Sequence, residues 1–342
     1  MKHLLAFITF FASLAAWAQG PNNSGTYYEA ADGKCGTELK TALFNIISPH
    51  TILQYKDLGG LFPSTDKRND GCVWDTYSNI TNYSFTDNKA NNCEGAGWNK
   101  EHTVPKSYFG GEVLPMYSDI THIMPTDAYI NNMRSNYPFG ETANPKKTSK
   151  NGFSKLGTCT TAGYTGMVFE PNDEYKGDFA RIYFYMVTCY EDRQGSFTQS
   201  SGNTCFSGNA YPCFKDWFKN MLLRWANDDP VSEKEIDRNN AVFALQGNRN
   251  PYVDYPGLEK YIWGDSMEKV FDYDNFGNDT PTTLKGDANG DGAIDVADIT
   301  TIAAIILDIE LSPAPNRSNA DANSDGTIDV ADITAVAAII LQ

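Results

Sequence analysis

The 342-residue sequence predicts an α+β domain followed by a small all-α domain. Residues 98–102, WNKEH, mix aromatic, polar and charged side chains without a helical period and precede Pro105, which favours a strand that ends in the Glu-His pair. The aromatic run at residues 183–190 is typical of a buried helix. The end of the chain repeats an acidic loop followed by an apolar helix, first from Asp287 and again from Asp321, 34 residues later.

Residues 1–18 predict a secretory signal peptide. A charged start precedes an apolar run over residues 4–14 that is too short to span a bilayer, and Ala-Trp-Ala at 16–18 provides a small-x-small cleavage site. The mature chain is expected to begin near Gln19 and to be secreted or held at the cell surface. No later stretch is long and apolar enough to predict a transmembrane helix.

Cysteine usage fits an exported chain. Export makes disulfides permissible, and no cysteine stands in a CxxC pair or close in sequence to both His102 and His122. We therefore expect up to three structural disulfides and one remaining thiol, rather than zinc ligands or nucleophiles. The seven cysteines are Cys35, Cys72, Cys93, Cys159, Cys189, Cys205 and Cys213.

The formal net charge of −16 argues weakly against a polyanionic partner. Its distribution weakens that argument, because residues 287–342 hold ten acidic residues and one arginine, a net −9, which leaves −7 for residues 1–286. One expected loop, rich in Asn, Pro, Ser and Gly, carries four lysines that either follow a phosphate backbone or form a solvated surface. They are Lys146, Lys147, Lys150 and Lys155.

Each C-terminal repeat begins with a twelve-residue loop suited to a calcium ion. Oxygen-bearing side chains stand at loop positions one, three, five, nine and twelve, and position seven offers its backbone carbonyl. Glycine at position six, Gly292 or Gly326, permits the sharp turn that such a loop needs. The sequence therefore predicts two structural Ca²⁺ ions. The predicted ligands are Asp287, Asn289, Asp291, Ala293, Asp295 and Asp298 in the first loop, and Asp321, Asn323, Asp325, Thr327, Asp329 and Asp332 in the second.

The two repeats resemble a type I dockerin domain. Each loop ends in aspartate rather than in the glutamate of an EF-hand, and a single helix follows each loop, expected at residues 299–307 and 333–341. Ile294 and Ile328, at position eight, are expected to pair the loops through a short strand. The resemblance implies a calcium-binding module that docks onto a cohesin-like protein; alternatively, the apolar helices form only the module's own core.

A second polar stretch follows the Glu-His pair. Pro125 can open a helix, in which Asp127, Asn131 and Arg134 fall at i, i+4 and i+7 on one stripe. A divalent cation held by oxygens, an arginine for the phosphate and a neutral imidazole as base would suffice for phosphodiester hydrolysis. The alternatives are structural: a lone histidine often packs in a core, helical side chains form surface pairs, and His122 either orients a ligand or caps a turn.

Five blocks between residues 39 and 263 together resemble the bacterial endonuclease I family, secreted or periplasmic nucleases of the ββα-metal (His-Me finger) type. The blocks are CVWDTYS, WNKEHTVPKSYFG, MYSDITHIMPTDAYINNMRSNYPFGE, KGDFARIYFYMVTCYED and RNNAVFALQGNRNPYVDYP, in that order. The resemblance implies a ββα-metal catalytic domain with additional helices over residues 19–279. A Pro/Thr linker at 280–285 would join it to the dockerin-like domain at 286–342.

The same resemblance assigns roles to single residues. It implies that His102 is the general base and that Glu101 and Asn131 hold one Mg²⁺ ion, for which Mn²⁺ is a substitute. Arg134 is implied as a phosphate contact or as a structural residue. Family members carry a transition-state arginine between the Glu-His pair and the asparagine, whereas here this segment contains no arginine and Lys106 is its sole cation. That role is therefore unassigned.

The sequence thus predicts a secreted, magnesium-dependent, largely sequence-nonspecific endonuclease that cuts DNA, with RNA as a second substrate, and leaves 5′-phosphate ends. The alternative is a calcium-binding scaffold or adhesion protein whose nuclease-like domain is inactive. A polysaccharide-degrading enzyme is a third class, which dockerins often accompany, but no spacing singles out a carboxylate pair. Arg181 and Arg249 are weaker candidates for the site, because core packing and turn formation explain their segments as well.

Overall fold

The computed structural model describes residues 20–87, 92–276, 285–290, 293–309, 311 and 315–341. The predicted signal peptide, the Asp291 ligand and most of the predicted linker lie outside the described residues. The chain divides into two compact units, with the boundary between residues 276 and 277, and each unit is described by itself. No helix in these ranges is long and apolar enough to cross a membrane.

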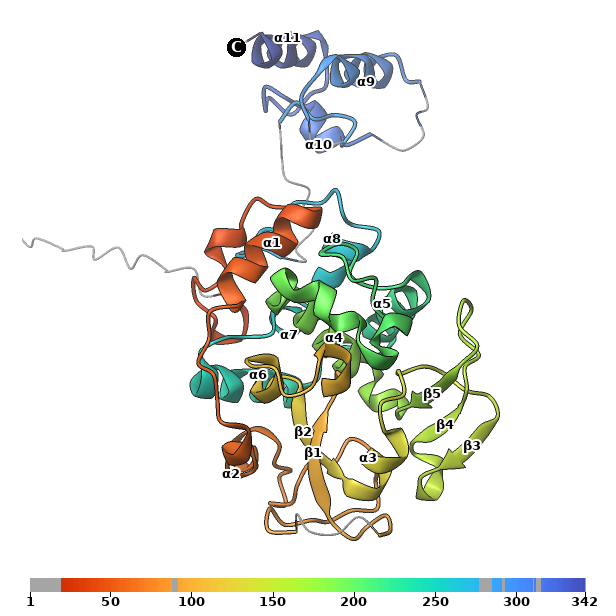
Figure 1. The fold of residues 1–342 in the computed structure, drawn as a ribbon. Coiled ribbons are helices and arrows are strands. Elements are labelled where there is room, and N and C mark those ends of the chain that lie inside the picture. Colours follow the sequence, from red (N-terminus) through yellow and green to blue (C-terminus); the bar gives the residue numbers. More distant parts are fainter. Residues whose placement is uncertain are drawn as a thin grey trace, which may run out of the picture. The chain divides into compact units, whose positions relative to one another are not determined.

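The first unit combines helices with two small antiparallel sheets (Figure 1). Its helices are α1 (Gly36–Ile47), α2 (Leu58–Thr65), α3 (Ala128–Arg134), α4 (Lys176–Cys189), α5 (Asp216–Asp228), α6 (Glu233–Gln246), α7 (Pro251–Asp254) and α8 (Leu258–Trp263). Its strands are β1 (Trp98–His102) and β2 (Ile123–Asp127) in one sheet, and β3 (Pro145–Thr148), β4 (Lys155–Thr158) and β5 (Met167–Glu170) in the other. The α+β class predicted for this part of the chain is confirmed.

Helix α4 forms the centre of the core of the first unit. Every residue from Gly177 to Cys189 is buried, and the aromatic rings of Phe179, Tyr183 and Phe184 lie in one continuous hydrophobic cluster with side chains from α1, α5 and α8. Burial of large aromatic side chains contributes more to the free energy of folding than burial of smaller apolar ones. The prediction of a buried aromatic helix is confirmed.

Strands β1 and β2 pair antiparallel, and helix α3 follows β2 directly. The register sets Glu101 opposite Met124 and His102 opposite Ile123, so the Glu-His pair stands at the last two positions of β1, as predicted. The predicted helix start at Pro125 is wrong, because Pro125 lies within β2 and α3 begins three residues later. Asp127 is the N-cap of α3, where its carboxylate accepts the backbone N–H of Ile130.

The four lysines of the predicted loop lie instead on and beside a β-hairpin. Strand β3 carries Lys146 and Lys147 and is exposed along its whole length, while β4 begins with Lys155. Lys150 lies between the strands and donates to the backbone carbonyl of Glu94. The expectation of an irregular loop is therefore wrong; strand pairing satisfies the backbone of this segment although its side chains are polar.

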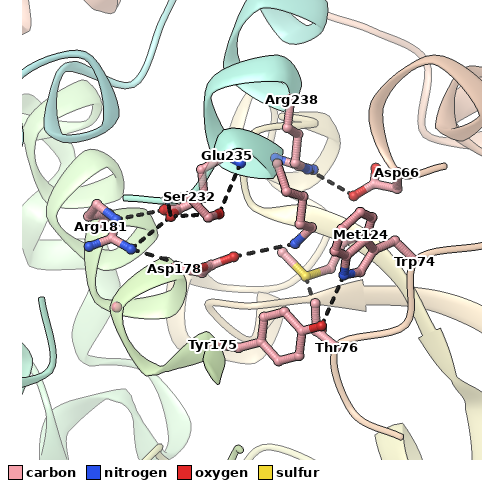
Figure 2. Close-up of polar contacts among 12 residues, drawn as sticks. Asp66, Trp74, Thr76, Met124, Tyr175, Asp178, Arg181, Ser232, Glu235 and Arg238 are labelled. Atoms are coloured by element: carbon pink, nitrogen blue, oxygen red, sulfur yellow. Dashed lines mark hydrogen bonds and ion pairs between the residues drawn. The ribbon is translucent and has the colours of Figure 1, made fainter. Parts of the chain in front are cut away.

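Buried ion pairs join α4 and α6 beside β2 (Figure 2). Arg181 donates through Nε and Nη2 to the two carboxylate oxygens of Glu235, at 2.6 and 2.8 Å. Arg238 pairs with Asp66 at 2.9 Å and also donates to three backbone carbonyls of residues 120–123, just before and at the start of β2. Such forked pairs orient the elements that they join. Arg181 thus ties two helices together and does not reach His102.

The second unit contains α9 (Val296–Ile306), α10 (Arg317–Ala320) and α11 (Val330–Ile340). Helices α9 and α11 begin three residues before the predicted starts, because Asp295 and Asp329 act as N-caps in matching capping boxes. A strand pairing Ile294 with Ile328 is not present in the described part of this unit; both side chains pack against its small core instead. Gly326 adopts a φ of +89°, the left-handed turn expected at position six.

All seven cysteines carry free thiols in the structure. Four of them, Cys159, Cys189, Cys205 and Cys213, are buried. The predicted disulfides are therefore not borne out, and the four buried cysteines act here as small apolar side chains of the core.

Candidate active site

The candidate site lies at the end of strand β1, where Glu101 and His102 leave the two-stranded sheet. Their side chains are almost fully buried, with exposed fractions of 3% for Glu101 and 8% for His102. Neighbouring strand residues normally point to opposite faces. The strand ends at His102, so the two side chains can serve one site from adjacent positions.

The His102 ring is held as a neutral imidazole. Its Nε2–H donates to the backbone carbonyl of Tyr117 at 3.1 Å, which leaves Nδ1 as the nitrogen that can accept a proton. No residue in the described part of the chain bonds to Nδ1, and this atom is not among the fully buried, unpaired polar atoms. Burial, and to a smaller extent the charge of the nearby His122 ring, lowers the pKa of His102 to about 3. A neutral, accessible Nδ1 is what a general base requires.

Two tyrosines lie beside the His102 ring. The rings of Tyr55 and Tyr117 lie nearly parallel to it, with interplanar angles of 16° and 13° and ring centroids 5.5 and 5.4 Å away. The two tyrosine rings also stack on each other, with their centroids 4.3 Å apart. This packing fixes the plane of the imidazole in addition to the hydrogen bond to Tyr117.

Tyr77 and Arg134 donate hydrogen bonds to the same one of the two carboxylate oxygens of Glu101. The hydroxyl of Tyr77 and Nη1 of Arg134 both donate to Oε1, at 2.7 and 2.6 Å. Burial raises the pKa of Glu101, while the positive charge of Arg134 opposes that shift. The second oxygen, Oε2, is bonded by neither donor and remains available to a cation or to a neighbouring side chain.

Helix α3 brings Asn131 beside Glu101. The Asn131 side chain lies within hydrogen-bonding reach of the Glu101 carboxylate, and its Nδ2 donates to Oδ1 of Asn99 at 2.8 Å. That bond orients the amide, so its Oδ1 is the atom left for a ligand. An amide oxygen and a carboxylate oxygen, two hard donors, thus stand side by side near His102.

Arg134 occupies a structural position rather than a surface one. Its exposed fraction is 1%, and besides the ion pair with Glu101 it donates to the backbone carbonyls of His102, Thr103 and Tyr137. All three guanidinium nitrogens are therefore engaged. Of the two roles considered for Arg134, the geometry favours the structural one, because the side chain is buried and four of its five N–H groups bond to Glu101 and to backbone carbonyls.

The remaining candidate residues are engaged in structural contacts, including His122, whose ring centroid lies 5.5 Å from that of His102. Asp127, expected on the polar stripe, is fully buried and accepts the hydroxyl of Tyr83 and the backbone N–H of Gly95. His122 is also fully buried and donates through Nε2 to the carbonyl of Met116 at 2.7 Å. Arg249 forms a buried ion pair with Asp254. These residues hold the fold around the site.

Sequence reasoning did not single out Tyr77, Tyr55, Tyr117 or Asn99. Tyr77 lies in the block CVWDTYS, which was recognised without a role. The residue type of Tyr77 is the one feature of that block that could have suggested a contact with Glu101, because a tyrosine can bury its ring while its hydroxyl donates to a carboxylate. The contribution of Tyr117 could not be found in this way, because its backbone carbonyl holds His102.

The two acidic loops of the second unit repeat the same hydrogen bonds. Asp298 accepts the backbone N–H groups of Asn289 and Asp295 at 3.1 and 2.9 Å, and Asp332 accepts those of Asn323 and Asp329 at the same two distances. Within the described ranges, no three Asp, Glu, His or Cys side chains converge as a metal cluster. The loop oxygens instead bind backbone N–H groups of their own loop, which keeps them near the loop centre.

Sequence comparison places the first unit among the nucleases, and a second domain is recognised after it. The family model Endonuclease I matches residues 35–257, and the model Dockerin type I domain matches residues 285–341. The chain therefore belongs to the endonuclease I family and carries a C-terminal type I dockerin domain, which confirms both resemblances found in the sequence.

Named relatives agree with this assignment. The chain is 34% identical over 259 residues to the extracellular ribonuclease of Bacillus subtilis (strain 168), covering 73% of this chain and 83% of the relative. It is 36% identical over 244 residues to the extracellular ribonuclease of Bacillus amyloliquefaciens, covering 70% and 78%. Endonuclease-1 of Buchnera aphidicola subsp. Baizongia pistaciae (strain Bp) is 30% identical over 137 residues, 40% of this chain and 46% of the relative.

Proposed function

We propose that the chain is a secreted, metal-dependent, largely sequence-nonspecific endonuclease whose dockerin domain tethers it to a partner. The observation that carries this proposal is the neutral His102 with an accessible Nδ1, next to the side-chain oxygens of Glu101 and Asn131. The proposed domains are a signal peptide at 1–18, a catalytic domain at 19–279, a linker at 280–285 and the dockerin domain at 286–342.

The donor set at Glu101 and Asn131 fits one Mg²⁺ ion, with Mn²⁺ as a substitute. Mg²⁺ prefers oxygen donors and keeps several waters, so two protein ligands are enough when the substrate phosphate supplies others. When bound, the ion would polarise the phosphate and stabilise the leaving oxygen. The strand, strand and helix order of β1, β2 and α3 supports the ββα-metal interpretation, because it places both ligands on neighbouring elements.

His102 would act as the general base through Nδ1. A water molecule aligned with the scissile phosphate would lose its proton to Nδ1, while the Tyr117 carbonyl keeps the Nε2 proton in place. Attack by that water and departure of the 3′ oxygen would leave the phosphate on the 5′ end. Arg134 would contribute by holding Glu101 and the β1 backbone in position rather than by touching the phosphate.

The substrate is proposed to be DNA, with RNA as a second substrate. Recognition through backbone phosphates requires few contacts to bases and suits cutting without sequence preference. The names of the two Bacillus relatives favour RNA and an extracellular location. Exposed Lys146 and Lys147 on β3 would add phosphate contacts that weaken as salt rises.

The dockerin domain is proposed to bind two Ca²⁺ ions and one cohesin-like protein. The repeated aspartates and asparagines of the two loops supply the hard oxygen donors that Ca²⁺ requires. Four apolar side chains at matching places of the two repeats are strongly exposed, which suits a partner surface. They are Val296 and Val330, and Leu307 and Leu341.

A calcium-binding scaffold or adhesion protein with an inactive nuclease domain is the second candidate function. The absence of an arginine between His102 and Asn131 is the observation that favours it. The intact arrangement of the base and the two proposed ligands opposes it, because an inactive domain has no need of an accessible imidazole nitrogen.

Cleavage assays on the purified full-length chain test the proposal. Plasmid DNA and RNA are incubated with Mg²⁺, with EDTA and with the variants His102→Ala and His50→Ala; His50 is the matched control outside the site. We expect metal-dependent cleavage of at least one substrate, lowered by about 10²- to 10⁴-fold in His102→Ala alone. A folded wild-type chain that cuts neither substrate at low salt would overturn the proposal in favour of the scaffold protein.

A further inference from the structure

Three cations lie near the His102 ring or near the tyrosine rings beside it, and two of them each bond to several protein groups. Arg134 is buried and bonded at all three guanidinium nitrogens. Lys100 is half-buried and donates to the backbone carbonyls of Tyr55 and Lys56. Neither can turn to a ligand without leaving acceptors unpaired.

Lys106 differs from both because it is exposed and held by a single anion. Its side chain has an exposed fraction of 45%, and within the described residues its Nζ forms an ion pair with Glu112 alone, at 3.0 Å, whose side chain is 65% exposed. Exposed pairs of this kind contribute little to stability, so a stronger anion can replace the carboxylate. Lys106 is therefore the cation near His102 that can change partners.

The position of Lys106 relates it directly to the base. Its Nζ lies 5.1 Å from the centroid of the Tyr117 ring, and that ring stacks on His102 with centroids 5.4 Å apart. The charge of Lys106 also contributes to the lowered pKa of His102. The ammonium group thus lies one aromatic ring away from the imidazole, on the same connection between β1 and β2 that supplies the Tyr117 carbonyl.

We propose that Lys106 binds a substrate phosphate next to the scissile bond and that Glu112 is the counter-ion which this phosphate displaces. The inference rests on the proposed nuclease function and names the residue that neutralises phosphate charge in it. A lysine acts as a point charge without the fork of an arginine, which suits a contact that must exchange one anion for another. Glu112 holds the ammonium group over Tyr117 until substrate arrives.

Four variants of the full-length chain test this inference. Lys106→Ala removes the charge, Lys106→Arg keeps it, and Glu112→Gln removes the competing anion. The matched control is Lys219→Ala, because Lys219 also pairs with an exposed carboxylate, that of Asp216 at 3.3 Å, far along the chain on α5. The measurements are kcat and KM with Mg²⁺, and binding of a DNA duplex in EDTA as a function of salt.

We expect Lys106→Ala to lower kcat/KM by about 10- to 100-fold and to reduce the salt slope of binding by about one unit, as expected for one lost phosphate contact. Lys106→Arg should keep most of the wild-type kcat/KM and of the wild-type salt slope, and Glu112→Gln should tighten the binding of the DNA duplex. Equal behaviour of Lys106→Ala and Lys219→Ala would overturn the inference. If the inference about Lys106 fails, the wild type still cleaves the substrate. If the proposed nuclease function fails, neither the wild type nor any variant cleaves it, so the two outcomes can be told apart.

Discussion

The candidate metal site of the first unit and the acidic loops of the second unit use the same kind of ligand in opposite settings. Glu101 is buried, bonded to Tyr77 and Arg134, and placed by a strand that pairs along its length. In the second unit, Asp295, Asp325 and Asp329 are exposed. Among the described loop aspartates, Asp298 and Asp332 are fully buried and hold their own loops, and Asp287 is buried as well.

The hydrophobic core is large in the first unit and small in the second. The first unit surrounds its site with a large cluster built on aromatic side chains, whereas the buried core of the second unit consists of Ala288, Ile302, Ile305, Ala320 and Val336. A core of that size supplies little of the free energy that folding requires, and small domains compensate with metal ions. The comparison teaches that the first site should stay formed without its ion, while the second unit should depend on its ions to fold.

Removal of calcium should have the largest effect and should separate the two units. In EGTA we expect the backbone amides of α9 and α11 to lose their protection against hydrogen exchange in the full-length chain, because the loop carboxylates then repel one another. Amides of α4 should stay protected. Hydrogen exchange with mass spectrometry measures both at once, and persistent protection of α11 in EGTA would remove the proposed dependence on calcium.

Removal of Arg134 should destabilise the first unit by about 3–5 kcal/mol, because Glu101 would remain buried without its charge partner. Arg134→Met tests this by urea unfolding. Arg134→Lys should rescue little, since one ammonium group cannot reach the acceptors that the guanidinium fork serves. Arg193→Ala, which breaks an exposed pair with Asp192, is the control and should cost less than about 1 kcal/mol. Equal losses in Met and control variants would contradict the structural role of Arg134.

The stability of the first unit should depend on pH rather than on calcium, through the ionisation of Asp75. Burial raises the pKa of this carboxyl to about 7. The folded state therefore binds more protons than the unfolded state between pH 4 and 7, so the contribution of Asp75 to stability falls as pH rises through that range, by about 2–4 kcal/mol. The free energy of unfolding of Asp75→Asn, minus that of the wild type, should rise with pH in that window. A constant difference would show that Asp75 ionises normally.

The smallest effect should come from the closing aspartates of the two loops. Asp298→Ala and Asp332→Ala each remove two hydrogen bonds to backbone N–H groups. In calcium-free protein that an osmolyte keeps folded, we expect each substitution to lower the free energy of unfolding of the second unit by about 1–2 kcal/mol, by the same amount in both repeats. Thermal unfolding followed by circular dichroism measures both. A clear difference between the two losses of stability would show that the repeats, although alike in sequence, differ in how much their final aspartates contribute to folding.

The sequence brought together the residues of the candidate site but not the residues that support them. Glu101, His102 and Asn131 could be proposed as site residues because a strand end and a helix follow from local pattern and because the family blocks surround them. Arg134 was ambiguous, since its residue type fits a phosphate as well as a buried carboxylate and only burial separates the two. Tyr117 could not be predicted, because any residue type offers the carbonyl that it uses.

The errors in the predicted fold have similar causes. Pro125 is a frequent first residue of helices, yet here it stands in β2 opposite Lys100, where the missing N–H is tolerated in a two-stranded sheet. The polar composition around Lys147 is typical of a loop, but pairing with β4 overrides that preference. Ile294 and Ile328 alternate with polar residues as strand residues would, and the small core takes their side chains instead.

The long connection between β1 and β2 has a consequence for how such an enzyme can diversify. It begins after His102, ends before Ile123, and carries Lys106, Glu112 and the Tyr117 carbonyl, whereas the proposed ion ligands stand outside it on β1 and α3. Exchange of this one segment between homologous enzymes would alter substrate preference and reaction rate while the ion-holding frame is inherited unchanged, which makes it the natural place to graft new specificity.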